Sequence, residues 1–257
     1  MDVGYIVSGF GVGLLVGITG VGGGALMTPL LIFGFGISPA VAVGTDLVFA
    51  AITKASGVWT HARQSTVDWR VVGRLASGSL PAALLTLAVL GEVDTHSAEA
   101  QGFITTLLGV ALMLTAAALL WRSHLSKVPH RHDDDGVERK GVVLATVAAG
   151  VVLGVLVTLT SVGAGALGAA ALFWLYPRFS AVRVVGTDIA HAVPLTAVAG
   201  FGHWQMGSVD TGLLMMLLIG SLPGIYLGSR LSKKIPERWL RPALATLLLV
   251  IGFRMVA

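Results

Sequence analysis

Apolar residues gather in ten stretches along the chain, and short polar segments separate them. The stretches cover residues 3–19, 24–36, 40–61, 70–91, 100–122, 142–161, 165–176, 184–204, 211–229 and 238–256. The longer ones reach the ~20 residues that a helix needs to cross ~30 Å of hydrocarbon. Strand-like alternation is absent, and Leu, Ala and Gly dominate, so we expect helices and not barrel strands. The pattern predicts an all-α integral membrane protein.

The composition of the chain supports this class. Of the 257 residues, 55% are apolar and 12% are charged, and the mean hydropathy is +0.86. That leaves too little polar surface to coat a soluble globule of this length. The net charge of +4 lies mostly in loops beside the apolar stretches, where it predicts membrane topology and not nucleic-acid binding. The chain has no cysteine, which excludes a disulfide or a thiolate metal site, and we expect no cofactor.

The two halves of the chain repeat one another. At an offset of 142 residues, fourteen of the thirty-nine positions in residues 43–81 are identical, including the Gly-Thr-Asp segment that ends at Asp46 and returns at Asp188. An offset of 141 residues aligns residues 19–26 with residues 160–167. Internal repeats in an apolar chain are a recurrent plan of membrane transporters.

The repeat divides the chain into two membrane domains and a linker. Residues 1–122 and residues 142–257 hold five apolar stretches each, and residues 123–141 form a polar linker. Because five is an odd number, the second repeat enters the membrane from the opposite side, so we predict two inverted repeats. The His-rich and acidic residues 130–135 of the linker fit no defined metal site, and we expect a solvated cytoplasmic loop and no metal.

The basic residues predict how the protein lies in the membrane. Fifteen of the seventeen Lys and Arg fall in four loops that ten segments place on one face: Arg63, Arg70 and Arg74; Arg122, Lys127, Arg131, Arg139 and Lys140; Arg178 and Arg183; and Arg230, Lys233, Lys234, Arg238 and Arg241. The positive-inside rule puts this face in the cytoplasm and both termini outside the plasma membrane, the bacterial inner membrane. The positions of the basic loops do not separate re-entrant segments from full crossings, but residues 24–36 and 165–176 give only about 18 to 20 Å of helix, which favours partial crossings.

Two glycine-rich breaks interrupt the apolar stretches at matched positions, after Thr19 and after Thr160. Helix cannot continue comfortably through such segments, and the helix that restarts points its N–H groups back at the break, where an anion can bind. The alternative is close packing, which we expect for the glycine rows Gly9, Gly13, Gly17 and Gly220, Gly224, Gly228. The candidate ligands are Thr19, Gly20, Gly22, Gly23, Gly24, Thr160, Ser161, Gly163 and Gly165, together with Thr45 and Thr187.

Asp46 and Asp188 are the strongest single-residue signal. A carboxylate inside a membrane helix costs about 3 kcal/mol on insertion scales and must face a cavity or a partner. Each is a candidate to contact substrate and to carry a coupling proton or bind a cation, or else to brace the neighbouring break through hydrogen bonds. Lys54 is a third candidate, for neutralising Asp46 or binding an anion; we slightly favour a side chain that extends toward the basic face at His61.

Three histidines offer weaker signals. His61 and His203 are matched between the halves and stand where their helices are expected to leave the membrane, so we interpret them first as interfacial residues. His191 follows Asp188 by three residues, which makes it a candidate hydrogen-bond partner of that carboxylate.

The order of the motifs in both halves resembles the TauE/SafE family of sulfite and organosulfonate exporters. The resemblance rests on the paired breaks, residues 20–24 and 161–165, on the repeated Gly-Thr-Asp segment and on the Gly-Ser-Leu-Pro segment that returns at residues 220–223. It implies secondary transport of a small sulfur-containing anion across the plasma membrane by alternating access, with protons as a candidate coupling ion. Many members of the family carry a neutral residue after the repeated threonine, where this chain has Asp46 and Asp188.

Two other classes of function compete with a transporter. An anion channel would use the same membrane architecture. An intramembrane aspartyl protease also carries two membrane aspartates, but its acids must share one site. We expect inverted symmetry to place Asp46 toward the outer face and Asp188 toward the inner face, so we expect no enzyme.

Overall fold

The computed structural model describes residues 2–19, 24–95, 97–125, 140–231 and 237–257, and no strand occurs among them. The described residues form ten α-helices: α1 (Asp2–Thr19), α2 (Gly24–Phe35), α3 (Pro39–Arg63), α4 (Trp69–Gly91), α5 (Ala98–Leu125), α6 (Lys140–Thr160), α7 (Ala166–Leu175), α8 (Ala181–Gln205), α9 (Thr211–Leu231) and α10 (Glu237–Val256). Each lies within a few residues of one predicted apolar stretch. The prediction of an all-α protein is therefore confirmed.

Five of these helices are long and apolar enough to cross a membrane: α4, most of α5, α6, α8 and α9. By contrast, α2 has 12 residues and α7 has 10, about 18 and 15 Å of helix. Large apolar side chains cover the outside, and Leu85, Leu144 and Trp174 are each about 70% exposed. An apolar coat of this kind suits a lipid bilayer and not water.

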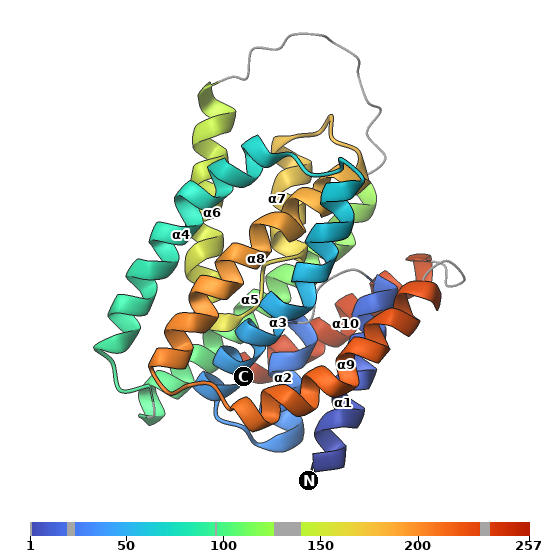
Figure 1. Cartoon of the computed structure of the whole chain (residues 1–257). Coiled ribbons are helices and arrows are strands. Elements are labelled where there is room, and N and C mark those ends of the chain that lie inside the picture. Colours follow the sequence, from blue (N-terminus) through green and yellow to red (C-terminus); the bar gives the residue numbers. More distant parts are fainter. Residues whose placement is uncertain (1, 20–23, 96, 126–139, 232–236) are drawn as a thin grey trace.

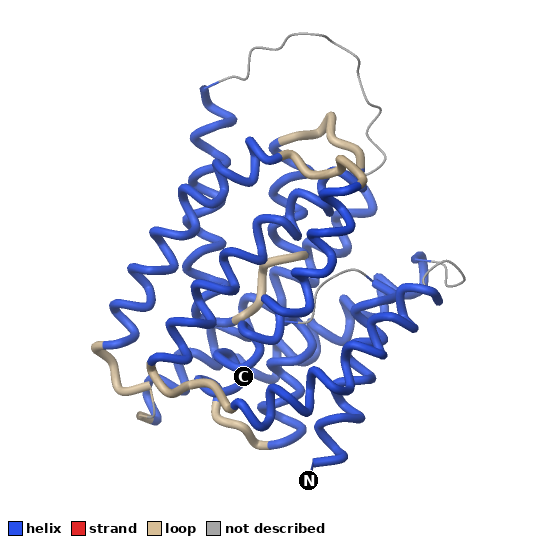
Figure 2. The backbone as a smooth tube through the Cα atoms, in the orientation of Figure 1, coloured by secondary structure: helices blue, strands red, loops and turns tan. Residues whose placement is uncertain are grey.

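The two short helices return toward the end of the bundle from which the preceding helix came. In Figure 1, α1 begins and α2 ends at the lower end, whereas α6 begins and α7 ends at the upper end. Most of the tan loops in Figure 2 lie at the two ends of the bundle, and one tan segment, residues 161–165, lies in its middle. The second glycine break is thus inside the helical bundle.

Helix packing follows the division into two halves. The closest pairs are α1 with α9, α4 with α6, α3 with α8 and α5 with α10. If each helix is replaced by its counterpart in the other half, the α1–α9 pair becomes the α6–α4 pair, whereas the α3–α8 and α5–α10 pairs stay the same. The halves are therefore interleaved, and each helix pair joins a helix of one half to a helix of the other.

Glycines allow the closest of these contacts. A Cβ atom at Gly13 of α1 would lie 2.5 Å from the Ser221 carbonyl oxygen of α9, and one at Gly224 would overlap the Phe10 carbonyl oxygen. Gly154 of α6 meets α4 in the same way. The packing role expected for the two glycine rows is confirmed, because only a missing side chain lets the backbones approach so closely.

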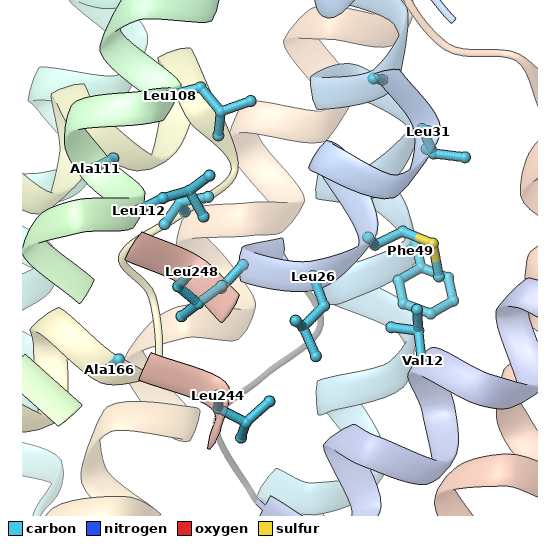
Figure 3. Close-up of a cluster of buried hydrophobic side chains, with 14 of the residues drawn as sticks. Val12, Leu26, Leu31, Phe49, Leu108, Ala111, Leu112, Ala166, Leu244 and Leu248 are labelled. Atoms are coloured by element: carbon cyan, nitrogen blue, oxygen red, sulfur yellow. The ribbon is translucent and has the colours of Figure 1, made fainter. Parts of the chain in front are cut away.

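One apolar core holds the beginnings of both short helices. Leu26 of α2 and Ala166 of α7 belong to the same buried cluster as Phe49 of α3, Leu112 of α5 and Leu248 of α10 (Figure 3). Burial of these side chains stabilises the short helices by tertiary packing, since helices of this length are marginal alone. The polar start of each short helix is thereby fixed next to the other half.

Candidate functional site

The second glycine break is an irregular turn between α6 and α7. Ser161, Gly163 and Gly165 have positive φ angles of 57°, 118° and 135°, a backbone region that glycine adopts without strain. The Thr160 hydroxyl accepts a hydrogen bond from the Val162 N–H at 3.1 Å. The turn therefore has a defined shape, as the sequence predicts for this segment.

Backbone donors at the start of α7 have no backbone acceptor in the part of the chain that the structure describes. The first N–H groups with an acceptor are those of Gly168, bonded to the Gly163 carbonyl, and Ala169, bonded to the Gly165 carbonyl. Among the described residues, the N–H groups from Gly163 to Leu167 make no backbone hydrogen bond. Free N–H groups at a helix start carry partial positive charge and are suited to an anion.

The start of α2 meets this break. A Cβ atom at Gly24 would overlap the Ser161 carbonyl oxygen, so the two backbones touch at this point. Thr19 ends α1 as Thr160 ends α6. The predicted ligands Gly20, Gly22 and Gly23 lie outside the described residues.

Asp46 is fully buried next to α2 and the second break. Its Oδ2 accepts a hydrogen bond from the Thr28 hydroxyl of α2 at 2.6 Å. The Ser161 hydroxyl lies next to the carboxylate without reaching hydrogen-bond geometry, and Oδ1 accepts no bond from a described residue. The contact with Thr28 was not predicted, although a hydroxyl within the apolar residues 24–36 is a usable signal.

Asp188 occupies the corresponding place in the other half. It is 2% exposed, and its carboxylate lies directly against the Cα of Gly168 in α7. A side chain at Gly168 would occupy the position of Oδ1. Each of the two aspartates on α3 and α8 therefore contacts the short helix of its own half.

Lys54 connects the two halves at this point. Its Nζ donates a hydrogen bond to the Ala164 carbonyl oxygen at 2.7 Å. The ammonium is also close enough to both Asp46 and Asp188 to interact with their charges. Our preferred interpretation of Lys54, a side chain extended toward the basic face, is wrong, because the bare carbonyl of the break offers a nearer acceptor.

The position of Lys54 also changes our expectation for the two carboxylates. We expected inverted symmetry to hold Asp46 and Asp188 toward opposite faces, but one lysine interacts with both. Asp46 and Asp188 are buried and Lys54 is partly buried between the charges of both. We call this region the central site and define it by Asp46, Lys54, Asp188, Thr28 and the break at residues 161–165. The break at residues 161–165, which borders it, lies in the middle of the bundle (Figure 2).

Thr45 and Thr187 have contacts other than those predicted. The Thr45 hydroxyl accepts a hydrogen bond from the Asp210 N–H at 3.1 Å, and the Thr187 hydroxyl accepts one from the Asp68 N–H at 3.0 Å. Asp68 and Asp210 stand in the loops before α4 and α9, at opposite ends of the bundle. Each hydroxyl therefore joins its helix to a loop of the other half, and the predicted contact of both threonines with substrate stays a prediction.

The end of the bundle near Asp68 has an additional ion pair. Arg183 of α8 donates to the Asp68 carboxylate. Asp68 also accepts hydrogen bonds from the Arg70 and Val71 N–H groups and so caps α4. Position 41, which matches Arg183 in the first half, is valine, so no matching ion pair can form at that position.

The histidines have defined partners. His191 Nε2 lies 2.8 Å from the Ser79 hydroxyl of α4, so the predicted bond to Asp188 is wrong, and α4 provides the nearer partner. His203 Nε2 donates to the Thr158 carbonyl at 2.9 Å, and His61 Nδ1 lies 2.9 Å from the Thr66 hydroxyl. His191 thus joins α8 to α4, His203 joins α8 to α6, and His61 joins the end of α3 to the loop that follows it.

Three grooves lie between helices on the outside of the bundle, with volumes of about 710, 730 and 500 Å³. Their walls are mainly apolar, and none of them is lined by Asp46, Lys54 or Asp188. They suit lipid chains better than an ion. No cluster of three potential metal ligands occurs among the described residues, and most of the His-rich linker lies outside them.

Comparison with known proteins identifies the family. Residues 5–255 match the family described as Sulfite exporter TauE/SafE. The chain is 42% identical over 258 residues to the probable membrane transporter protein YjnA of Bacillus subtilis (strain 168), with all of both chains covered. It is 28% identical over 255 residues to the probable membrane transporter protein YdhB of the same strain, covering 94% of this chain and 97% of YdhB.

A probable membrane transporter protein of Methanocaldococcus jannaschii is 26% identical over 267 residues, with 98% of this chain and 94% of the relative covered. No solved structure matches the chain significantly. The match covers both halves and the central site, and the relatives share the chain's full length. This membrane-embedded protein therefore belongs to the sulfite exporter TauE/SafE family.

Proposed function

We propose that this protein is a secondary transporter that moves a small sulfur-containing anion, sulfite or an organosulfonate, across the plasma membrane by alternating access. The observation that carries the proposal is that the start of α2 meets the second break, whose Ala164 carbonyl accepts a hydrogen bond from Lys54. Free N–H groups and an ammonium are favourable partners for an oxyanion. The proposed ligands are Thr19, Gly20, Gly22, Gly23, Gly24, Lys54, Thr160, Ser161, Gly163 and Gly165.

The proposed membrane arrangement is a pair of inverted repeats with both termini outside. It is supported by the helix pairs that exchange between halves and by the opposite ends at which the hairpins α1–α2 and α6–α7 open (Figure 1). The short helices then form re-entrant hairpins that reach the middle of the membrane from opposite sides. The four basic loops lie on the cytoplasmic side in this arrangement.

Alternating access requires that each end of the bundle can open separately. The Thr45–Asp210 and Thr187–Asp68 contacts supply one matched closure at each end. With both closures formed, Asp46 and Asp188 are buried, which supports an occluded carrier over an open channel. Movement of one half against the other would expose the central site to one side at a time.

Asp46 and Asp188 are the proposed coupling groups. With both carboxylates ionised, an incoming anion meets two negative charges and one positive charge in a medium of low polarity, where repulsion is strong. Protonation of a carboxylate removes this repulsion, so proton and anion binding favour one another. The alternative is that the carboxylates hold the breaks in shape through hydrogen bonds, and the Thr28–Asp46 hydrogen bond supports this structural role.

Counterflow in proteoliposomes tests the proposal. We expect unlabelled sulfite or isethionate inside the vesicles to drive uptake of the labelled anion against its gradient, because a carrier exchanges substrate and a channel does not. Asp46→Asn should keep counterflow and lose pH-driven flux, since the amide still accepts from Thr28 but cannot carry a proton. Equal loss of both activities together with lower thermal stability would leave only the bracing role, and transport without counterflow would identify a channel.

A further inference from the structure

We infer that the groove between α4, α5 and α6 binds one acyl chain of a membrane phospholipid whose head group carries an ammonium, as in phosphatidylethanolamine. The groove has a volume of about 710 Å³, and no residue of the central site lines it. The lipid site is therefore separate from the proposed substrate site. Three features of the groove support the lipid: a gap between consecutive helices, a length close to one leaflet and a polar mouth.

The groove lies in a gap between two helices that follow one another in the chain. Over their described residues, α4 packs on α6 and α8, α5 packs mainly on α10 and α7, and α4 and α5 do not form a packed pair. Leu85 of α4 and Phe103 of α5 line the groove and are 69% and 63% exposed. One face of α6 also lines it, with Val151, Val155 and Leu159. In a bilayer, hydrocarbon chains fill such a gap, because an empty one would leave these side chains without contacts.

The groove is about as long as one leaflet of a bilayer. Along α4 it runs from Leu90, one residue before the end of the helix, to Ala82, near its middle, which is about 12 Å of helix. Val93 in the following loop extends it. Half of a hydrocarbon core of ~30 Å is about 15 Å. An acyl chain that enters at the α4–α5 loop therefore stays within one leaflet, the outer one in the proposed orientation.

The mouth of the groove is polar and its interior is apolar. Thr95, Ser97 and Glu99 line the groove at the α4–α5 loop. The Thr86 hydroxyl, further in, donates to the Ala82 carbonyl oxygen of its own helix at 2.7 Å, so it needs no polar ligand. A long apolar groove with polar groups at one end suits an amphiphile, with its chain inside and its head group at the loop.

Glu99 and the two hydroxyl groups favour a zwitterionic head group. Glu99 is exposed in the first turn of α5 and has no ion pair with another described residue. The Ser97 hydroxyl accepts a hydrogen bond from the Ala100 N–H at 3.3 Å and keeps its own proton to donate. The hydroxyls can therefore bind a lipid phosphate while the carboxylate binds the ammonium. Phosphatidylglycerol has a phosphate but no cation, so Glu99 would repel its negative charge.

Lipid titration of the purified full-length protein in detergent tests this site. Native mass spectrometry counts the lipids bound to each chain, and thermal unfolding measures their effect on stability. We expect phosphatidylethanolamine to bind about three- to fivefold more tightly than phosphatidylglycerol, since an exposed ion pair contributes a modest free energy, and to raise the melting temperature. Phosphatidylglycerol binding that equals or exceeds that of phosphatidylethanolamine would overturn the inference.

Two substitutions tie the lipid preference to Glu99. Glu99→Gln keeps the shape of the mouth and removes its charge, so the two lipids should bind with about equal affinity. Glu92→Gln is the matched control, because Glu92 is exposed at the end of α4 and does not line the groove. It should keep the wild-type preference. A folded Glu99→Gln variant that still prefers phosphatidylethanolamine would contradict the role of the carboxylate.

Filling the groove tests where the lipid lies. Ala100→Trp places a large side chain in the groove from α5, and Leu85→Trp does so from α4. We expect either to weaken the binding of both lipids by at least about tenfold, because the space for the chain is lost. Ala98→Trp is the control, since Ala98 is exposed in the same turn of α5 and does not line the groove.

Undiminished lipid binding by a folded filling variant would overturn the assignment to this groove. A wild-type dimer that both filling variants lose would overturn it as well, because a second copy of the chain would then occupy the groove.

Discussion

Lys54 joins the two halves through one hydrogen bond to the Ala164 carbonyl. A substitution can remove its charge and keep a hydrogen-bond donor at the same position. Lys54→Gln keeps a donor for the Ala164 carbonyl but removes the ammonium. We expect the variant to insert and fold, and to bind substrate at least about tenfold more weakly, because charge-assisted bonds to an oxyanion are about twice as strong as neutral ones. Substrate titration by thermal shift measures the change.

Lys140→Gln is the control for this substitution, since Lys140 is exposed at the start of α6. It loses the same charge outside the central site, and its substrate affinity should equal that of the wild type. Equal substrate affinity of the two variants would show that the Lys54 ammonium does not bind the substrate.

Asp68 provides a test of pH dependence. Partial burial raises the pKa of Asp68, but hydrogen bonds from the Val71 N–H and Arg183, the charge of Arg183 and the Arg70 N–H outweigh it, so the pKa is lowered. A carboxyl group with a lowered folded pKa stabilises the protein above its unfolded value of 3.8, and this contribution disappears as the pH falls through the folded value.

Asp68→Asn keeps the cap of α4 and loses the ion pair with Arg183. We expect it to lower the free energy of unfolding by up to about 1 kcal/mol at neutral pH, because the pair is partly exposed. In acid, where the wild-type carboxyl group is protonated, the two proteins should unfold alike. Thermal unfolding in detergent across this range measures the difference, and a difference that is independent of pH would contradict the ion-pair role.

Single residues differ in how far the sequence determines their role. The burial of Asp46 and Asp188 follows from their position inside apolar stretches. The partner of Lys54 does not, because the side chain is long enough to reach either the membrane face or the break, and only the three-dimensional position of Ala164 decides between them. His191 is a similar case, since helical spacing suggested Asp188 while α4 brings Ser79 closer.

At the scale of elements, the α1–α9 pair depends on backbone contact at glycine. Gly13→Ala would place a methyl group 2.5 Å from the Ser221 carbonyl oxygen, and we expect it to destabilise the protein by about 1 to 3 kcal/mol through overpacking. Gly11 lies in the same helix, and a methyl group there meets nothing within 4 Å. Gly11→Ala should therefore be neutral, or stabilising by up to about 1 kcal/mol through helix propensity.

Thermal unfolding of the two variants in the same detergent gives the comparison. The difference between them isolates packing, because both replace glycine by alanine in α1. Equal stabilities would show that α1 and α9 can separate without loss and that the glycine row has another role.

The helices themselves were largely predictable, because apolar stretches and glycine breaks mark their limits in the sequence. The expected stretch at residues 165–176 became α7 at Ala166–Leu175, and that at residues 70–91 became α4 at Trp69–Gly91. The contacts between elements were not predictable to the same degree. A repeat shows that Thr45 matches Thr187, but it does not show that each bonds a loop of the other half.

At the scale of the whole molecule, the two closures should stop transport when they are made permanent. The absence of cysteine allows one pair at a time, Thr45→Cys with Asp210→Cys or Thr187→Cys with Asp68→Cys. We expect oxidation of either pair to abolish counterflow and reduction to restore it, because each pair holds one end of the bundle shut. Transport at the wild-type rate with either pair fully cross-linked would contradict their role as closures.

The orientation of the molecule is tested with the same cysteine-free background. An impermeant thiol reagent applied from outside should label Glu92→Cys and leave Ser65→Cys unlabelled in whole cells, since both positions are exposed and lie in loops predicted on opposite sides. Labelling of Ser65→Cys alone would reverse the proposed orientation.

The central claim is that the substrate is held where the two breaks meet. Ala164 carries the carbonyl that binds Lys54, and its side chain is only partly buried, so Ala164→Cys places a reactive thiol at the central site. The measurement is the labelling rate of this thiol in proteoliposomes with and without a transported sulfonate, compared with Ser65→Cys in its exposed loop. We predict that saturating substrate slows labelling at position 164 by about tenfold or more and leaves position 65 unchanged. Equal labelling rates at position 164 with and without a substrate that the variant still transports would contradict the account.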